Sequence, residues 1–477
     1  MLLRQTTTYL LAHGFSAALG FLSVILFTRM LTPAQYGIYV VAFGVAGVFS
    51  SLLFTWVRLS VLRFESEGGG ADVRLTALAA YLVSVMTTPI VLAVTVWVIG
   101  MPVERAAAAL VLALALGLFD LGQEILKARL ATGAYLRATM LRALAAIGLS
   151  LALIQAGWGG FGLIAGVAGA YLIAALATAG SVWKGPRKPF DRGAFGQMAR
   201  FGVPMALSGL VFALHAALDR LLVAWLLGDA AAGIYGVAAD LVRQIIQFPA
   251  MAVGSALAPL AIRALSEGGR AAADEHLARS GELMLAVILP AVVGLAIVAP
   301  HLAALILGES FRPTAAALIP ILAFAWLFQV VSQQYVQVSF HLAKRPPLLV
   351  LHGLSALLAN VVAMVVLVPV LGLKGAALSL VIAEAVGVLV GFVLSRFAHP
   401  LPVNPWPVLK VVAAVAAMAV PTVLVERYLD SHAAIDLAIS VAVGIAIYGL
   451  TAIVFDIAGL RGVAVGILSR WRGAATR

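Results

Sequence analysis

Apolar segments of about 20 residues follow one another along the chain, separated by short polar stretches. A helix of about 20 residues rises roughly 30 Å, which is the thickness of the hydrocarbon core of a bilayer. The pattern therefore predicts an all-α polytopic membrane protein with about fourteen transmembrane helices. The expected spans are 8–30, 35–57, 75–98, 106–126, 138–156, 161–183, 201–226, 231–259, 281–299, 315–340, 347–370, 374–396, 407–425 and 435–458.

Basic residues gather on one side of this predicted topology. If the N-terminus is cytoplasmic, 22 of the 31 lysines and arginines fall on the cytoplasmic side and 5 on the other side. This bias obeys the positive-inside rule, and one span missed or added in mid-chain would destroy it, because every later loop would change sides. We therefore expect an even number of spans, with both termini in the cytoplasm and the protein in the inner (plasma) membrane.

The composition agrees with a chain that has lipid as its main solvent. Hydrophobic residues make up 63% of the sequence and charged residues 11%, and the mean hydropathy is +1.09; soluble domains carry about 25% charged residues. Basic loops at anionic lipid account for the net charge of +11, so no nucleic-acid partner is expected. The absence of cysteine excludes disulfides, thiolate catalysis and cysteine-based zinc sites.

One long polar stretch divides the chain. Trp183–Arg200 is rich in Lys, Arg and Pro and lies between the sixth and seventh predicted spans. We interpret it as a cytoplasmic linker between two helical lobes. The expected organisation is an N-terminal lobe at 1–183, a linker at 184–200, a C-terminal lobe at 201–397, and two additional spans with a basic cytoplasmic tail at 398–477.

The two halves contain related sequences. The segment 31–42 (LTPAQYGIYVVA) matches 227–238 (LGDAAAGIYGVA) at a constant offset of 196 residues, which pairs Gly37 with Gly233 and Tyr39 with Tyr235. Each segment closes a helical hairpin and opens the second helix of its lobe. This coincidence indicates an internal duplication, and transporters built from such repeats place their substrate between the two copies.

The same segments resemble a known family. Phe27 to Tyr39 (FTRMLTPAQYGIY) is similar to the first hairpin of bacterial polysaccharide exporters and O-antigen flippases, and so is Phe201-Gly202-Val203-Pro204 with Asp219-Arg220 at the start of the second half. Leu307-Gly308, Asn360 and the stretch Pro369 to Ala377 resemble later signatures of that family. The likeness runs from about residue 4 to residue 395.

This resemblance implies a fold of the MOP superfamily, which the family shares with multidrug and toxin extrusion (MATE) transporters. Two pseudo-symmetric six-helix lobes would surround a central cavity, with two further C-terminal helices. The implied substrate is an undecaprenyl-diphosphate-linked oligosaccharide. Membrane lipids, a sodium ion or proton, and the polysaccharide polymerase and glycosyltransferases of the same pathway are the implied partners.

Ionisable side chains inside the spans are the main candidates for function, because placing one at the bilayer centre costs about 2.5–3.5 kcal/mol. Asp219 and Arg220 lie together in the seventh span, where they either face a cavity or form an inter-helix salt bridge. Asp240 and Arg243 are three residues apart in the eighth span, so they can neutralise one another locally. The arginine forks would bind a diphosphate in a wet cavity.

Glutamines extend these polar faces. Gln244 and Gln247 follow Arg243 on the same face, which favours a cavity wall over a purely structural ion pair. Gln329 and Gln333 lie one turn apart in the tenth span. Their amides both donate and accept, which suits sugar hydroxyls; contact between helices is the alternative.

Three further candidates lie on other spans. Glu384, near the middle of the twelfth span, either binds a coupling proton or cation or has a structural partner. Arg29 and Arg58 end the first two spans, where they either anchor the helix ends or bind a lipid phosphate. The fourth span ends in a polar face that we interpret as solvated, with a cavity mouth as the alternative. That face consists of Asp120, Gln123, Glu124 and Lys127.

These observations favour a flippase that works by alternating access. No P-loop motif occurs, so an ion gradient or the membrane potential is the expected driving force. Drug or cation efflux on the same scaffold is the alternative. A membrane glycosyltransferase or polymerase is disfavoured, because the outer loops are short and no catalytic or metal-binding motif occurs. We expect no catalytic residue, no metal site and no cofactor.

Overall fold

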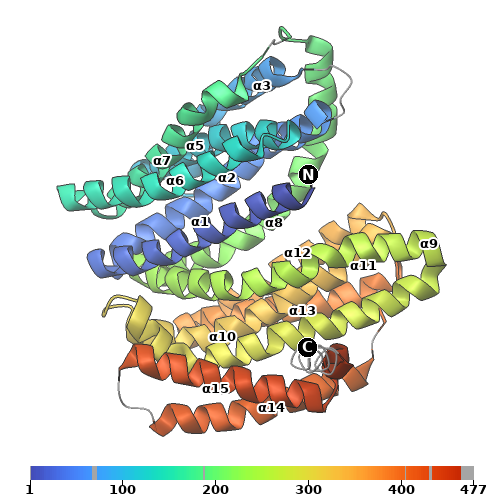
Figure 1. The fold of residues 1–477 in the computed structure, drawn as a ribbon. Helices are drawn as coiled ribbons and strands as arrows, with labels where there is room; N and C mark the ends of the chain where they lie inside the picture. Colours follow the sequence, from blue (N-terminus) through green and yellow to red (C-terminus); the bar gives the residue numbers. More distant parts are fainter. Residues whose placement is uncertain (1, 67–71, 186–187, 403, 429–431, 463–477) are drawn as a thin grey trace, which may run out of the picture. The chain divides into compact units, whose positions relative to one another are not determined.

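The computed structural model describes residues 2–66, 72–185, 188–402, 404–428 and 432–462, and this part of the chain is helical without any strand (Figure 1). The helices of the first half are α1 (Leu2–Met30), α2 (Pro33–Ser66), α3 (Arg74–Met86), α4 (Thr88–Trp97), α5 (Val103–Ala128), α6 (Thr132–Leu153), η1 (Ile154–Trp158), α7 (Gly159–Val182) and α8 (Arg192–Leu227). The second half contains α9 (Asp229–Ile306), α10 (Arg312–Val331), η2 (Ser332–Val336), α11 (Gln337–Leu342), α12 (Pro346–Leu371), α13 (Leu373–Ser395), α14 (Pro405–Tyr428), α15 (Ala433–Val454) and η3 (Ile457–Gly459).

The predicted all-helical polytopic architecture is confirmed. Within the described residues, 11 helices are long and apolar enough to cross a membrane. One of these, Thr132–Val182, holds two of the predicted spans, separated by a turn at Gly157 and Gly159 where φ is positive. The predicted spans 8–30 and 231–259 correspond to α1 and to the first part of α9. Every predicted span therefore falls on helical residues, although 75–98 is divided between α3 and α4, and 315–340 between α10, η2 and α11.

The longest helix contains a break that separates two predicted spans. α9 runs for 78 residues, and Gly269 interrupts it with φ 70° and ψ −163°. Glycine adopts this conformation without the steric cost that a Cβ atom would bring. The break lies in the stretch between the eighth and ninth predicted spans, so α9 is a pair of helices joined by a sharp bend.

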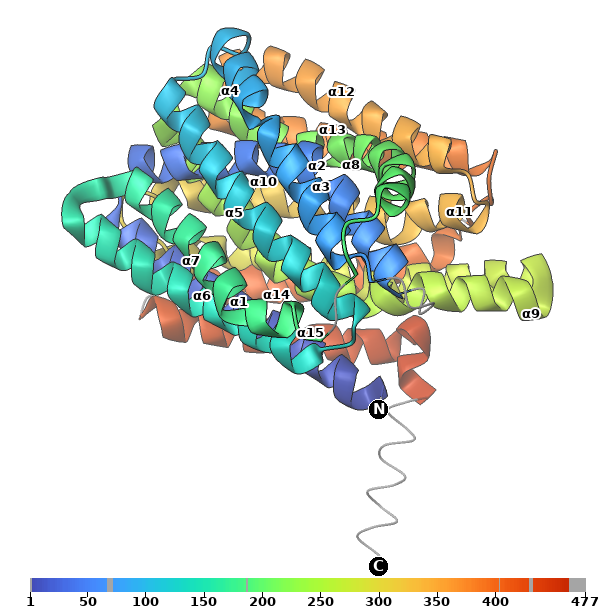
Figure 2. The same cartoon turned by 90° about the horizontal axis from the view of Figure 1, so that it is seen from above.

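The chain forms two compact units, Met1–Gly236 and Val237–Arg477. In the first unit, α8 packs along α2, while α5 packs against α2 and α7 (Figures 1 and 2). In the second unit, α13 packs between α10 and α12, and α14 pairs with α15. The predicted lobe boundaries stay a prediction, and the predicted basic tail beyond residue 462 lies outside the described residues.

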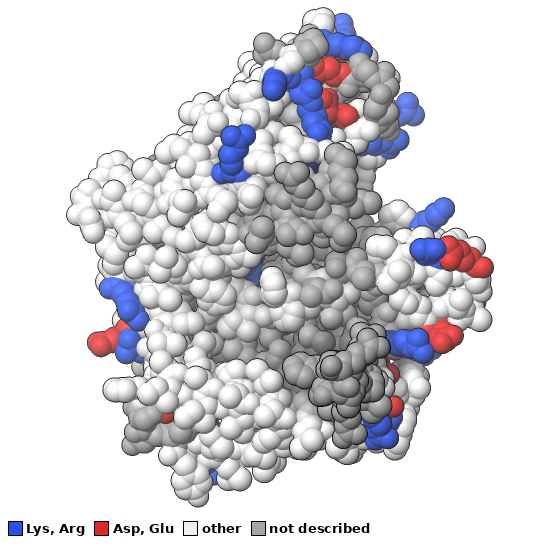
Figure 3. Space-filling model, in the orientation of Figure 1, with Lys and Arg blue, Asp and Glu red and all other residues white. Residues whose placement is uncertain are grey.

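Uncharged residues cover most of the described surface in this view, and charged side chains gather in a few patches at its margins (Figure 3). Residues such as Trp97, Leu176 and Leu389 are large, apolar and more than 60% exposed. Such a surface requires lipid rather than water around it. The distribution therefore agrees with spans that cross a bilayer.

The start of the predicted linker is hydrogen-bonded to arginine side chains of the first unit. The guanidinium of Arg74, which is 1% exposed, donates from Nη1 to the carbonyl oxygens of Val182 (3.0 Å) and Lys184 (2.8 Å). Its Nε and Nη2 donate to the Asp72 carboxylate at 2.9 and 2.5 Å. Arg129 also donates to the Lys184 carbonyl, at 3.0 Å. The start of the linker is therefore held by buried and charge-assisted hydrogen bonds.

Candidate functional site

A cluster of charged side chains lies inside the first unit, where α2 meets α5. Arg58 of α2 contacts Asp120 at 2.8 Å and Glu124 at 3.6 Å, and Lys127 contacts Glu124 at 3.0 Å. Arg142 of α6 lies within electrostatic range of Asp120, and its guanidinium lies 5.3 Å from the ring centre of Tyr171. We call Arg58, Asp120, Glu124, Lys127 and Arg142 the Arg58 cluster.

The Arg58 cluster corrects one interpretation of the sequence. Gln123 and Glu124 are each only 6% exposed, so the polar face of α5 is not a set of solvated helix-end charges. Arg58 supplies the partner that the sequence did not show. The cluster has three cations and two carboxylates, and Arg58 Nε is buried without a hydrogen bond in the described residues. This surplus of positive charge suits an anionic group.

Asp219 and Arg220 occupy a tightly packed position in α8. Asp219 is 6% exposed and accepts hydrogen bonds from the Tyr235 hydroxyl at 3.0 Å and from the Arg220 backbone N–H at 2.8 Å. Tyr235 belongs to α9 and to the second copy of the sequence repeat. Asp219 therefore joins two helices through a hydroxyl. Arg220 is half-buried beside it, and its predicted cavity-facing role stays a prediction.

The polar face of α9 lies in the second unit. Arg243 contacts Asp240 at 3.1 Å, as the spacing predicted, yet 44% of the Arg243 side chain stays exposed. Gln247 is also exposed, and the buried Oε1 of Gln244 accepts no hydrogen bond from the described residues. The Asp240–Arg243 ion pair thus lies within one helix, and it engages only Nη2 of the exposed Arg243 guanidinium.

The glutamines of the tenth predicted span lie where the α-helix α10 passes into a π-helical turn. Gln329 is half-buried in α10, and Gln333 is exposed in the π-helical turn η2. Their neighbour Gln334 lies against α9, because a Cβ atom on Gly254 would fall 2.0 Å from its Oε1. π-Helical turns inside α-helices are frequent at functional sites. Gln334 and α9 therefore meet within one unit.

Glu384 is buried in α13, which packs against α12. The glycines Gly387 and Gly391 set the register of α13 against α12, since Cβ atoms there would contact Ala356 and His352. α12 carries Asn360, a side chain that the sequence did not single out for function. Asn360 is 0% exposed, and neither its Oδ1 nor its Nδ2 has a hydrogen-bond partner in the described residues.

The signal that could have found Asn360 was its amide in an otherwise apolar span. A buried amide with neither hydrogen bond satisfied costs free energy. Such an amide can bind a water, an ion or a polar group of a substrate. No group of three or more His, Cys, Asp and Glu side chains in the described part of the chain is arranged to hold a metal ion.

The two copies of the repeat contact one another through their glycines. A Cβ atom on Gly37 would fall 1.8 Å from the Asp229 carbonyl oxygen, and one on Gly233 would fall 2.1 Å from the Pro33 carbonyl oxygen. Arg105 strengthens this contact with two hydrogen bonds to Asp229, at 2.8 and 2.7 Å. Arg29 is exposed nearby in sequence, at the end of α1.

Comparisons with known proteins agree with this fold. The family described as polysaccharide biosynthesis protein matches residues 26–316. The structure of a lipid II flippase MurJ in an inward closed conformation has a TM-score of 0.75 and 16% identity, and the match covers 94% of this chain and 98% of that chain. No curated protein matches the sequence.

Multidrug transporters give a second set of structural matches. A MATE family transporter of the MOP superfamily in an inward-facing conformation has a TM-score of 0.61 and 18% identity, with 80% of this chain and 93% of that chain covered. An outward-facing MATE transporter has a TM-score of 0.53 and 17% identity, with 83% and 94% covered. At these identities the likeness concerns the fold, and the resemblance found in the sequence is confirmed. The chain belongs to the polysaccharide biosynthesis protein family, on a fold that it shares with MOP superfamily transporters.

Proposed function

We propose that the protein is a flippase that moves an undecaprenyl-diphosphate-linked oligosaccharide, such as an O-antigen or exopolysaccharide repeat unit, to the outer leaflet of the bacterial inner membrane. One observation carries this proposal. The match to the polysaccharide biosynthesis family covers residues 26–316 and so includes all four candidate arginines. These are Arg29, Arg58, Arg220 and Arg243. The fold supports the same function, because it is also that of a lipid II flippase structure.

The headgroup would be held by arginines. A lipid diphosphate carries negative charge through a region of low dielectric constant, and guanidinium groups bind phosphate oxygens in pairs. The exposed part of Arg243 and the positive surplus of the Arg58 cluster supply such donors. Gln244, Gln247, Gln329 and Gln333 would bind sugar hydroxyls through their amides.

Transport would proceed by alternating access, driven by a sodium ion or a proton. Glu384 is the candidate coupling group, because it is an ionisable residue that is 3% exposed inside a predicted span. The amide of Asn360 in the neighbouring helix α12 is buried and has no hydrogen bond in the described residues, so it would suit a cation or a proton-bearing water. Asp219 and Asp240 are charge-pair candidates whose contacts within the chain already hold them.

The predicted orientation completes the proposal. Both termini would lie in the cytoplasm, so that the linker and the bend of α9 face the enzymes that build the substrate. A polysaccharide polymerase and glycosyltransferases of the pathway would act before and after transport. The protein itself would catalyse no reaction.

A second candidate function is efflux of drugs or organic cations. The MATE structures favour it, since they share the fold with a TM-score of up to 0.61. The buried carboxylates of Asp219 and Glu384 would suit a cation. We favour the flippase because the family match is to polysaccharide biosynthesis and because arginines accompany these acids.

The headgroup proposal is tested by flipping in liposomes. We expect Arg243→Ala and Arg220→Ala each to slow translocation of an undecaprenyl-diphosphate oligosaccharide about tenfold or more, since a hydrogen bond to a charged group contributes roughly 1.5–3 kcal/mol. Arg279→Ala is the matched control, because its side chain is 79% exposed and lies beyond the spans. Wild-type rates in both the Arg243→Ala and the Arg220→Ala proteins would contradict the proposal, and transport of an organic cation in place of the lipid would support efflux.

Coupling is tested with imposed ion gradients. Glu384→Gln keeps the shape of the side chain and removes its charge, so we expect flipping to lose its response to a proton or sodium gradient. Asn360→Leu should weaken the same response. Glu275→Gln, whose side chain is 76% exposed, should keep it. A Glu384→Gln protein that still responds to the gradient would show that coupling occurs elsewhere.

A further inference from the structure

A cavity of about 300 Å³ lies in the second unit, where α9, the π-helical turn η2, α13 and the start of α14 come together. Its wall includes Glu282 and Leu285 of α9, Tyr335 of η2, Phe392 of α13 and Val408 of α14. A volume of this size is at the lower end of the range for small-molecule sites. None of the candidate headgroup or coupling residues lines this cavity, so it is a separate feature of the protein.

The cavity lies at the depth where the predicted spans end. Glu282 is near the start of the span 281–299, Phe392 is near the end of the span 374–396, and Val408 is near the start of the span 407–425. All three of these ends are predicted to face the cytoplasm. A ligand in the cavity would therefore meet lipid headgroups on one side and hydrocarbon on the other.

The less exposed polar groups of the cavity accept hydrogen bonds. The Tyr335 hydroxyl donates its hydrogen to the Pro402 carbonyl oxygen at 3.1 Å, so the phenolic oxygen keeps lone pairs only. The Glu282 carboxylate is an acceptor as well. The donors among the lining residues, Arg279 and Asn404, belong to exposed side chains. A wall of acceptors is complementary to a group that carries several donors and no acceptor, as an ammonium does.

Glu282 gives the cavity an uncompensated negative charge. Arg279 contacts Glu275 at 3.9 Å, and these two side chains are 79% and 76% exposed. They form a pair of opposite charges in solvent. Glu282, by contrast, takes part in no ion pair with the described residues. The cavity therefore favours a cationic ligand.

Two aromatic rings form part of the same wall. The ring centres of Tyr335 and Phe392 lie 6.4 Å apart. The Tyr335 ring packs on the backbone of α9, since a Cβ atom on Gly281 would fall 3.0 Å from it. The face of an aromatic ring attracts a cation within about 6 Å. Together with Glu282, the rings suit an organic cation, whereas a diphosphate would be repelled, so the cavity lies off the proposed substrate route.

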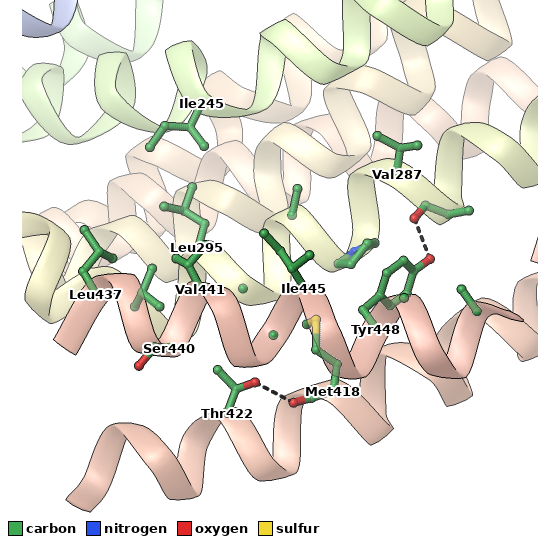
Figure 4. A pocket seen from close by; sticks show the side chains of 18 of the residues that line it. Ile245, Val287, Leu295, Met418, Thr422, Leu437, Ser440, Val441, Ile445 and Tyr448 are labelled. Carbon is green, nitrogen blue, oxygen red and sulfur yellow. Dashed lines mark hydrogen bonds between the residues drawn. The ribbon is translucent and has the colours of Figure 1, made fainter. Parts of the chain in front are cut away.

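Glu282 is held where the end of α15 meets α9. The Ala458 N–H of η3, which follows α15, donates to its Oε1 at 3.0 Å. Nearby along α9, the Tyr448 hydroxyl donates to the Ala286 carbonyl oxygen at 2.5 Å, beside a second cavity of about 650 Å³ whose lining residues are all uncharged (Figure 4). The second cavity offers no charge to a headgroup, whereas Glu282 supplies one to the smaller cavity. Because these contacts fix the carboxylate in advance, a ligand would not have to order it.

We propose that this smaller cavity binds the ammonium group of a phospholipid headgroup in the cytoplasmic leaflet, as a resident lipid and not as a transported one. The ammonium would donate to Oε2 of Glu282 and to the Tyr335 oxygen, and it would lie against the Phe392 ring. The phosphate would stay at the exposed rim, and the acyl chains would follow Leu285 and Val408 into the hydrocarbon. Since α9, η2, α13 and α14 all contribute to the wall, the lipid would link the two C-terminal spans to the helices before them.

Native mass spectrometry of the full-length protein tests this site. The protein in detergent is titrated with phosphatidylethanolamine, and separately with N-acetyl-phosphatidylethanolamine, which has the same chains and phosphate but no ammonium. Glu282→Gln removes the charge and keeps an oxygen for the Ala458 N–H, while Tyr335→Phe keeps the ring and removes the phenolic oxygen. Glu267→Gln is the matched control, because Glu267 also belongs to α9, is 64% exposed and does not line the cavity.

We expect the first phosphatidylethanolamine to bind the wild type and Glu267→Gln about tenfold or more tightly than the N-acetyl lipid does, since hydrogen bonds to a charged group are strong. Glu282→Gln should lose this preference while unfolding at the wild-type temperature without lipid, and Tyr335→Phe should reduce it severalfold. Equal binding of the two lipids by the wild type, or a full preference in Glu282→Gln, would overturn the proposal. Equally tight binding of soluble phosphoethanolamine would overturn it too, because the ligand would then be a free amine. None of these outcomes depends on whether the protein is a flippase.

Discussion

Replacing Gly37 or Gly233 by alanine is expected to destabilise the first unit by about 3 kcal/mol, at the upper end of the usual cost of overpacking. The added methyl group would fall 1.8 Å from the Asp229 carbonyl oxygen in one case and 2.1 Å from the Pro33 carbonyl oxygen in the other. Backbone atoms cannot rotate away as a side chain can. The two hairpins would therefore have to separate, and the Arg105–Asp229 ion pair would be strained with them.

Thermal unfolding of the purified protein measures this effect. Gly47→Ala is the matched control, because Gly47 belongs to the same helix, α2, and a Cβ atom there would meet nothing within 4 Å. Alanine also favours a helix over glycine by roughly 0.5–1 kcal/mol, so this variant should be as stable as the wild type or more so. Equal unfolding temperatures for Gly37→Ala and Gly47→Ala would show that the hairpins do not make this contact.

Arg74→Met is expected to cost about 3 kcal/mol, because removing one partner of a buried ion pair leaves the other uncompensated. The variant would lose the hydrogen bonds to Val182 and Lys184 as well. The linker would come free of α3, so proteases should cut within residues 183–191 faster. Arg192→Met, in which an exposed arginine at the start of α8 is replaced, should leave both stability and cleavage unchanged.

The ion pair between Arg74 and Asp72 also predicts that the stability of the protein depends on pH. The hydrogen bond from the Arg74 side chain holds the pKa of Asp72 below its usual value of 3.8. A carboxyl with a lowered pKa in the folded state contributes stability above its unfolded pKa, and that contribution is lost as the pH falls through the folded pKa. Wild-type protein should therefore lose part of its advantage over Arg74→Met below about pH 4. A constant difference down to the most acidic pH would contradict this role of Asp72.

The sequence by itself determined that the chain is helical, and it gave the order and the approximate position of each apolar span. In lipid, each backbone N–H and C=O group of a span must be hydrogen-bonded within the protein. A run of about 20 apolar residues that crosses the membrane therefore forms a helix. Gly157 and Gly269, where the backbone turns, both lie between predicted spans, so the sequence also gave the approximate positions of these turns. The repeat at an offset of 196 residues predicted related hairpins, and the structure brings Gly37 and Gly233 into contact.

What only the tertiary structure decided was the partner of each polar side chain. From the sequence, Glu124 was interpreted as a solvated charge at a helix end, whereas the structure places Arg58 beside it. The hydrogen bond between Asp219 and the Tyr235 hydroxyl could not be inferred from the sequence either. The structure also brings His301 of α9 into contact with Glu426 of α14, although the two residues are 125 positions apart in the sequence. No pattern of residue spacing predicts such a contact. Hydropathy gives the depth of a residue in the membrane. The rotation and register of each helix, which follow from packing against its neighbours, decide which buried charges meet.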